Sequence, residues 1–209
     1  MFTLNENKSL HLNYLKTTTN MKILILAFSL LTSYSFAQAL PTWSVDVSHS
    51  NMGFKVKHKT ISYTVGDFRD FELIVKTPNE SFENAQVNLT IKTASINTAN
   101  DSRDEHLRGV DFFDALQFPE IIFVSKKVTA TKSDEYAVLG DLSMHGITKE
   151  LTLLMKHNGT AKTRRGSELA GLYFSTIFKR LDFNIGTDMP TSVVADDIEL
   201  NAEIEIIKD

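Results

Sequence analysis

The sequence predicts an all-β protein: a single antiparallel β-barrel of about eight main strands with a short helical insertion around residues 100–116. Two observations favour this fold class. Apolar and polar residues alternate with a period of two in many short stretches. Turn-forming residues separate these stretches at intervals of roughly 8–12 residues. A sandwich would show the same pattern, but closure into a barrel removes the exposed edges of so many amphipathic strands.

The expected strands share one pattern, in which one face is apolar and the other is polar. They cover, in chain order, residues 43–47, 52–57, 71–75, 87–92, 151–156, 172–178 and 198–206. The last strand is the clearest, because apolar and polar residues alternate without a break from Ile198 to Ile206. We expect each strand to have one face in solvent and one face inside the barrel.

Turn-forming residues separate the predicted strands. The clearest groups lie at residues 77–79, 132–135, 157–159, 165–167 and 188–190. Four glycines are expected to permit turn dihedral angles or bulges: Gly66, Gly140, Gly146 and Gly186. Only residues 99–116 interrupt the strand pattern with a segment that suits a helix.

The N-terminal region has the form of a secretory signal. A positive start, a nine-residue apolar run at 23–31 and the small residues Ser35 and Ala37 are its parts. Such a run is far shorter than the roughly 20 apolar residues that a membrane-spanning helix needs. We therefore expect residues 21–37 to be a signal peptide that directs the protein to the periplasm or outside the cell. Residues 1–20 are expected to be a non-native or wrongly assigned extension.

Composition limits the partners of the remaining chain. Removing residues 1–37 takes away three lysines and one glutamate, so the formal net charge falls from −4 to −6. This balance argues against nucleic acid, which calls for a basic face. The chain has no cysteine and therefore neither disulfides nor thiolate chemistry. No linker or repeat divides residues 38–209, so we expect them to form one barrel domain.

The most informative stretch for function begins at Arg103. It places Arg103, Asp104 and His106 close to Phe112 and Phe113 in the sequence. On a helical turn, residues 103 and 106 share a face. We expect this charged turn to cover an open end of the barrel, with its cations available to hold an anionic head group. In the alternative interpretation, Arg103 and Asp104 only cap a loop and the phenylalanines belong to the core.

Five blocks of sequence carry a resemblance to a known family. They are Asp46–Ser50 followed by Phe54 and His58, Val65–Phe68, Arg103–Phe123, Gly140–Lys149 and Arg180–Gly186. In this order they resemble the YceI-like domain, a lipocalin-like antiparallel barrel that binds polyisoprenoid lipids. The resemblance covers residues 43–207. Other members often carry a threonine and an arginine where this chain has Met144 and His145.

The resemblance implies a carrier or storage protein and not an enzyme. Its ligand would be an isoprenoid lipid, either a polyprenyl diphosphate or an isoprenoid quinone, and no other cofactor is expected. A homodimer and transient contact with a membrane are both left open. The polar candidates for ligand binding are Arg103, Asp104, His106, His145 and Arg180. The apolar candidates are Phe54, Val56, Phe112, Phe113, Phe174 and Ala202.

Three other functions are considered. A metal or haem-linked role would use His49, His58, His106 and His145. No two of these histidines have the i,i+2 or i,i+4 spacing of a local metal site, although a barrel can bring distant ligands together. A hydrolase would pair His106 with Asp104, but the chain has neither a Gly-x-Ser-x-Gly elbow nor a Ser-x-x-Lys motif. The third alternative is an interaction module, whose inward stripes would fill a solid core.

Overall fold

The computed structural model describes residues 39–78 and 81–209, so the expected extension and signal peptide lie outside the described residues. The strands are β1 (Thr42–Val45), β2 (Asn51–His58), β3 (Ser62–Phe68), β4 (Phe71–Lys76), β5 (Gln86–Lys92), β6 (Ile96–Asn97), β7 (Glu120–Lys132), β8 (Glu135–Met144), β9 (Ile147–Lys162), β10 (Glu168–Lys179) and β11 (Val194–Lys208). The helical elements are η2 (Val47–His49), η3 (Thr93–Ser95), α2 (Asp101–Arg108) and η4 (Arg180–Phe183). None of the described helices is both long enough and apolar enough to span a membrane.

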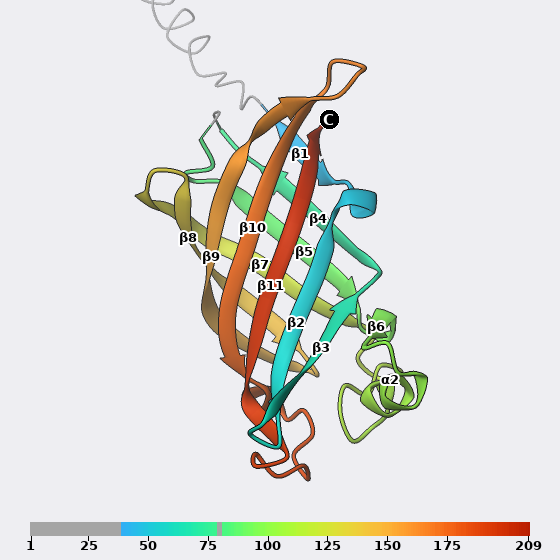
Figure 1. Cartoon of the computed structure of the whole chain (residues 1–209). Helices are drawn as coiled ribbons and strands as arrows, with labels where there is room; N and C mark the ends of the chain where they lie inside the picture. The colour runs from blue at the N-terminus through green and yellow to red at the C-terminus, as the bar shows by residue number, and fades with distance from the viewer. Residues whose placement is uncertain (1–38, 79–80) are drawn as a thin grey trace, which may run out of the picture. The chain divides into compact units, whose positions relative to one another are not determined.

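Eight strands close into an antiparallel barrel (Figure 1). Their order around the ring is β1, β4, β5, β7, β8, β9, β10 and β11. Strand β1 closes the ring, because Trp43 lies opposite Val75 of β4 on one side and Lys208 of β11 on the other. The predicted antiparallel barrel of about eight strands is confirmed, and so is a short helix within residues 100–116.

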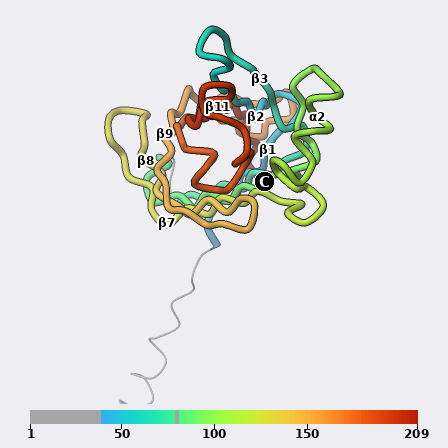
Figure 2. The backbone as a smooth tube through the Cα atoms, turned by 90° about the horizontal axis from the view of Figure 1, so that it is seen from below, coloured from blue at the N-terminus to red at the C-terminus, as the bar shows by residue number. Residues whose placement is uncertain are grey.

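A hairpin extends the sheet beyond the ring. After β1 ends, η2 turns the chain and β2 continues along β11, while β3 pairs with the other edge of β2. Strand β3 meets β6 only at Asp67 and Phe68. Helix α2 follows β6, and the tip of the hairpin, α2 and the loop before β11 all lie toward the same end of the barrel (Figures 1 and 2).

The opposite end of the barrel is solidly packed. The ring of Phe82 lies between those of Trp43 and Tyr136, with centroid separations of 6.2 and 6.3 Å. Fully buried side chains from five strands fill the rest of the interior at this end: Val75, Val138, Met155, Leu172 and Ile206. A solid core, the alternative that periodicity left open, therefore occupies this end.

Two expectations about turns need correction. Residues 157–159 do not form a turn but lie inside β9, where the pairing register with β10 shifts beside Gly171. Gly66 lies within a strand, and Gly140 lies within β8 where the pairing register with β7 shifts, as expected of a bulge; Gly146 and Gly186 adopt the positive φ angles of turns as expected. A Cβ at Gly66 or Gly140 would lie 2.5 Å from the ring of a neighbouring phenylalanine. These two positions require glycine because an aromatic ring lies directly on the backbone.

Candidate functional site

An apolar cavity occupies the end of the barrel that carries α2 and the hairpin. Its volume is about 1210 Å³, which includes space that is open to solvent. Only a small part of this volume admits the centre of a water molecule, so the void is narrow. Every strand except β1 contributes to the lining. Such a space suits a slim hydrocarbon chain better than a compact ligand.

The four predicted wall residues, Phe54, Val56, Phe174 and Ala202, all line this cavity. Ala202 is fully buried and lies opposite Phe174 of β10 and Met52 of β2. It is the last residue of β11 that lines the cavity, because the next inward-facing position, Ile204, does not. Ala202 therefore marks the inner end of the void, where the packed core begins.

Phe112 and Phe113 also line the cavity and form part of its open end. Phe113 meets the ring of Phe68 edge to face, with centroids 6.0 Å apart. Phe112 lies against Gly186, where an added Cβ would be 2.7 Å from the ring. These contacts join the segment after α2 to β3 on one side and to the loop before β11 on the other. Phe113 is only partly buried, so solvent reaches this part of the lining.

Arg180 lines the cavity with a guanidinium group that is fully engaged by the protein. Its side chain is 2% exposed and donates hydrogen bonds to five backbone carbonyls. The acceptors belong to Ile185, Gly186, Met189, Val194 and Ala195, at distances from 2.5 to 3.1 Å. Burial lowers the pKa of Arg180 below its ordinary value. Because the guanidinium has five N–H donors in all, this arginine clamps a loop and keeps no donor for a ligand.

Thr176 is the other residue with a polar side chain among those that line the cavity. Its hydroxyl donates to the carbonyl of Thr152 at 3.0 Å. Together with the engagement of Arg180, this leaves no unpartnered polar side chain in the lining described here. The enclosed part of any ligand therefore meets hydrocarbon alone.

Arg103 and Asp104 fasten α2 to the segment after β6. Asp104 is 4% exposed and accepts hydrogen bonds from the backbone nitrogen and the hydroxyl of Thr98 at 2.9 and 2.5 Å. Arg103 donates to the same hydroxyl and to the carbonyl of Thr98 at 2.7 and 2.9 Å. The structure thus gives both residues a structural contact and does not place them in the cavity lining. A direct role in ligand binding stays a prediction.

His106 and His145 likewise lie outside the cavity lining. His106 is exposed and its Nε2 lies 3.2 Å from a carboxylate oxygen of Asp111, while its ring stacks edge to face on Phe112. His145 occupies the tight turn between β8 and β9 and contacts the carbonyl of Phe183 at 3.0 Å. Each histidine therefore touches a segment near the cavity without facing the void, and contact with a ligand stays a prediction.

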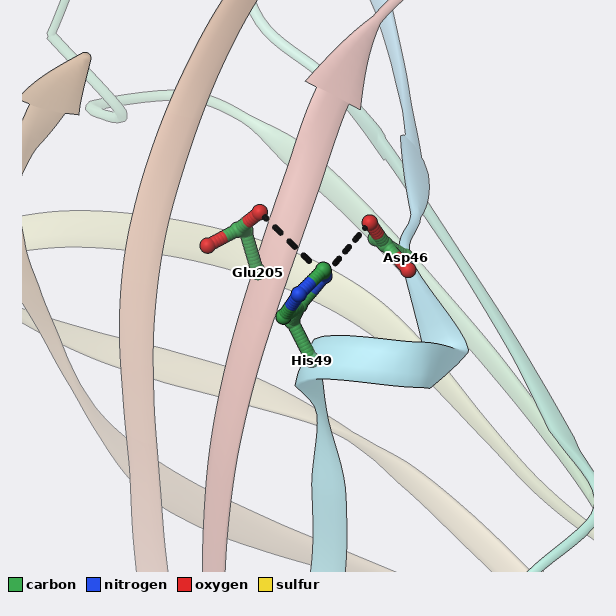
Figure 3. A group of neighbouring side chains, drawn as sticks. All are labelled: Asp46, His49 and Glu205. Carbon is green, nitrogen blue, oxygen red and sulfur yellow. Dashed lines mark hydrogen bonds and ion pairs between the residues drawn. The ribbon is translucent and has the colours of Figure 1, made fainter. Parts of the chain in front are cut away.

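A polar cluster lies elsewhere, where η2 meets β11 (Figure 3). Nδ1 of His49 is 2.9 Å from Asp46 and 3.9 Å from Glu205. Hydrogen bonds from Ser48 and His49 lower the pKa of Asp46 to about 2, whereas the hydrogen bond to Asp46 raises the pKa of His49. In the part of the chain that the structure describes, this is the only group of three potential metal ligands within reach of one ion. The four histidines of the metal hypothesis do not come together there.

Sequence reasoning missed part of the cavity wall. Ile121 and Phe123 of β7 line the void, but they stand in an unbroken apolar run with Ile122 and Val124. Such a run gives no alternation from which an inward face can be assigned. Leu107 of α2 also lines the cavity. It is the one apolar residue of a charged helix, so the sequence shows no apolar periodicity from which its inward position could be predicted.

The closed barrel, solid at one end and hollow at the other, defines a lipocalin-like small-molecule-binding barrel. The family profile of the YceI-like domain matches residues 43–206, and the chain belongs to this family. The YceI-like domain is a binding-protein fold. The resemblance noted in the sequence is thereby confirmed.

Several known proteins are similar to this chain. A UPF0312 protein of Staphylococcus aureus is 32% identical over 171 residues, which cover 79% of this chain and 97% of that protein. The YceI protein of Campylobacter jejuni is 35% identical, with a TM-score of 0.68 and coverage of 79% and 96%. A domain from Saccharophagus degradans, described as polyisoprenoid-binding, has a TM-score of 0.63 at 14% identity and coverage of 81% and 99%. This last likeness shows the fold alone.

Proposed function

We propose that the protein encloses the tail of a long isoprenoid lipid for transport or storage. The observation that carries this proposal is a narrow cavity, open at one end, whose lining has no unpartnered polar side chain among the described residues. A hydrocarbon chain gains free energy there from the area that it removes from water, at about 25 cal/mol per Å². Membership of the YceI-like family supports the same proposal, as does the description of the Saccharophagus degradans domain as polyisoprenoid-binding.

The head group, in this proposal, stays at the mouth and is uncharged. A diphosphate calls for free cationic donors, but every N–H of Arg180 is donated to a backbone carbonyl. Arg103 and His106 both lie outside the cavity lining, where Arg103 donates two of its N–H groups to Thr98 and His106 contacts Asp111. An isoprenoid quinone or alcohol, which needs only neutral partners, therefore fits better than a polyprenyl diphosphate.

The signal-like segment at 21–37 supports a location in the periplasm or outside the cell. In such a place a carrier would move a water-insoluble lipid between membranes or hold it in reserve. We propose this location together with the function.

The test is to narrow the cavity without disturbing the fold. Val56 lines the void on β2, so Val56→Trp places a large side chain in the path of the tail. Val124→Trp is the matched control, because Val124 is 46% exposed on β7 and does not line the cavity. Both variants and the parent protein would be stripped of lipid and incubated with a polyprenol of known length. Native mass spectrometry then measures the fraction of protein in a one-to-one complex.

We expect the parent protein and Val124→Trp to bind the polyprenol equally, and Val56→Trp to bind at least about tenfold less, the loss of roughly 1.4 kcal/mol. Binding should not change with salt, because a neutral head has no charge to screen. Full occupancy of Val56→Trp, or no complex with the parent protein, would contradict the proposal. A clear preference for polyprenyl diphosphate that weakens with salt would contradict the neutral head group.

A further inference from the structure

The β2–β3 hairpin carries an exposed apolar surface on its outer side. Ile61 in the turn is 85% exposed, and Tyr63 and Val65, which share one face of β3, are 52% and 63% exposed. They alternate with the small polar residues Ser62 and Thr64, which lie on the other face of the same strand. A folded protein that shows three neighbouring apolar side chains to water has a surface suited to an apolar partner.

Three lysines stand beside these apolar residues. Lys55 lies opposite Val65 and Lys57 lies opposite Tyr63, so each pair projects from the same face of the hairpin. Lys59 follows in the turn. No acidic residue occurs between positions 51 and 66, although the chain as a whole has a net charge of −4. Within the described part of the chain, Lys57 and Lys59 have no ion-pair partner, whereas Lys55 is paired with Glu199 at 2.8 Å.

The turn at the tip of the hairpin has a strained backbone. Lys59 and Thr60 have φ angles of 47° and 60°, in the left-handed region. A turn with positive φ angles favours Asn or Gly, and a β-branched residue such as threonine is strained there. Residues with such angles often mark functional sites. Here the strain accompanies an exposed cation next to Ile61.

The two sides of the hairpin face different surroundings. Phe54 and Val56 of β2 point inward and line the cavity, while Ile61, Tyr63 and Val65 point outward. We propose that the hairpin surface, defined as Lys57, Lys59, Ile61, Tyr63 and Val65, docks the protein on a membrane that contains anionic lipid. This inference rests on the proposed function, because docking there would bring the mouth of the cavity to the bilayer from which an isoprenoid is taken.

Charge and residue type select an anionic bilayer as the partner. Tyrosine favours the membrane–water interface, and lysine can bury its methylene groups while its ammonium stays among the head groups. Lysines near an anionic surface add electrostatic attraction that weakens as salt rises. A second copy of this chain fits less well, because a symmetric contact would set the lysines of one copy against those of the other.

The first experiment measures co-sedimentation with vesicles of phosphatidylcholine, with and without 30% phosphatidylglycerol. One variant, Ile61→Asn with Val65→Thr, removes the apolar part of the hairpin surface. A second, Lys57→Gln with Lys59→Gln, removes its charge. The controls are Ile177→Asn, at a residue that is 64% exposed on β10, and Lys127→Gln with Lys162→Gln at exposed lysines elsewhere. Thermal melts of all variants should match that of the parent protein, because every change is on the surface.

We expect the parent protein to bind the anionic vesicles and to lose binding as salt rises. Each hairpin variant should bind about tenfold less or weaker still, while both controls bind as the parent does. The inference is overturned if the parent does not bind anionic vesicles, or if the hairpin variants bind equally well. It is also overturned if analytical ultracentrifugation shows a dimer that the hairpin variants convert to monomer.

The second experiment separates this inference from the proposed function. Each protein is supplied with the same polyprenol either in detergent micelles or in anionic vesicles, and the rate and extent of loading are followed. The hairpin variants should load fully from micelles but about tenfold more slowly from vesicles. Failure of the parent protein to load from micelles would overturn the proposed function. Equal loading of parent and hairpin variants from vesicles would overturn the docking surface alone.

Discussion

Arg180 acts on the cavity through the backbone that it holds. The five carbonyls that it engages lie between Ile185 and Ala195, in the loop before β11 and at the start of that strand. One of these carbonyls belongs to Gly186, whose Cα lies against the ring of Phe112. The arginine therefore positions one wall of the mouth. A buried charge of this kind is stabilised because every one of its donors is hydrogen-bonded.

The pair formed by Asp46 and His49 should respond to pH in two separate ranges. The pKa of Asp46 is lowered from 3.8 to about 2, so its contribution to stability is present above about pH 4 and is lost as the pH falls toward 2. The pKa of His49 is raised above 6.5, so its contribution is present below about pH 6.5 and is lost as the pH rises through the raised value.

Asp46→Asn tests this pairing directly. The hydrogen bond to the carboxylate is the largest cause of the raised pKa of His49, so the substitution should move that pKa back toward 6.5. An NMR titration of the His49 ring measures it, with Asp101→Asn, an exposed acid on α2, as the control. An unchanged His49 titration in Asp46→Asn would show that the carboxylate does not set the pKa.

Helix α2 is held mainly by polar contacts and not by an apolar face. Its sequence has one apolar residue, Leu107, and its buried residue is Asp104. Asn100 caps the helix by accepting a hydrogen bond from the backbone nitrogen of Arg103 at 3.0 Å. The contacts of Arg103 and Asp104 with Thr98 then fix the helix to the segment after β6.

Asp104→Ala should lower the free energy of unfolding by about 1–3 kcal/mol, the range for a buried donor that loses its acceptor. The donor is the backbone nitrogen of Thr98, which bonds Asp104 at 2.9 Å. Asp101→Ala, at an exposed position in the first turn of the same helix, should cost only about 0.3–1 kcal/mol. Unfolding by denaturant compares them, and equal losses would refute the role given to Asp104.

The strands with strict alternation could be predicted from the sequence, and those without it could not. The pattern from Ile198 to Ile206 identifies β11, because one face is in solvent and the other faces inward. Strand β3 could not be predicted in this way, because two of its apolar residues, Tyr63 and Val65, lie on the exposed face. The site was predictable to a similar extent. Apolar wall positions such as Phe174 follow from alternation, whereas the partners of Arg180 depend on a loop that no local pattern specifies.

The barrel as a unit combines two interiors that periodicity alone does not distinguish. The same inward stripe of β11 contributes Ile206 to the packed core and Leu200 to the cavity wall. The packed end supplies stability through dense apolar contacts. The hollow end lacks such apolar contacts, and an enclosed lipid tail would supply them. The protein should therefore be more stable to unfolding when lipid is bound.

The most direct measurement is the affinity of lipid-free protein for neutral polyprenols of increasing length. The account predicts that affinity rises with each added isoprene unit, by at most about 0.8 kcal/mol per buried carbon, until the cavity is full and then stays constant. Because Ala202 marks the inner end, Ala202→Phe should move this plateau to a shorter chain, whereas Ala161→Phe, on an exposed part of β9, should leave it unchanged. Affinity that does not depend on chain length, or a plateau that Ala202→Phe does not shift, would contradict the account.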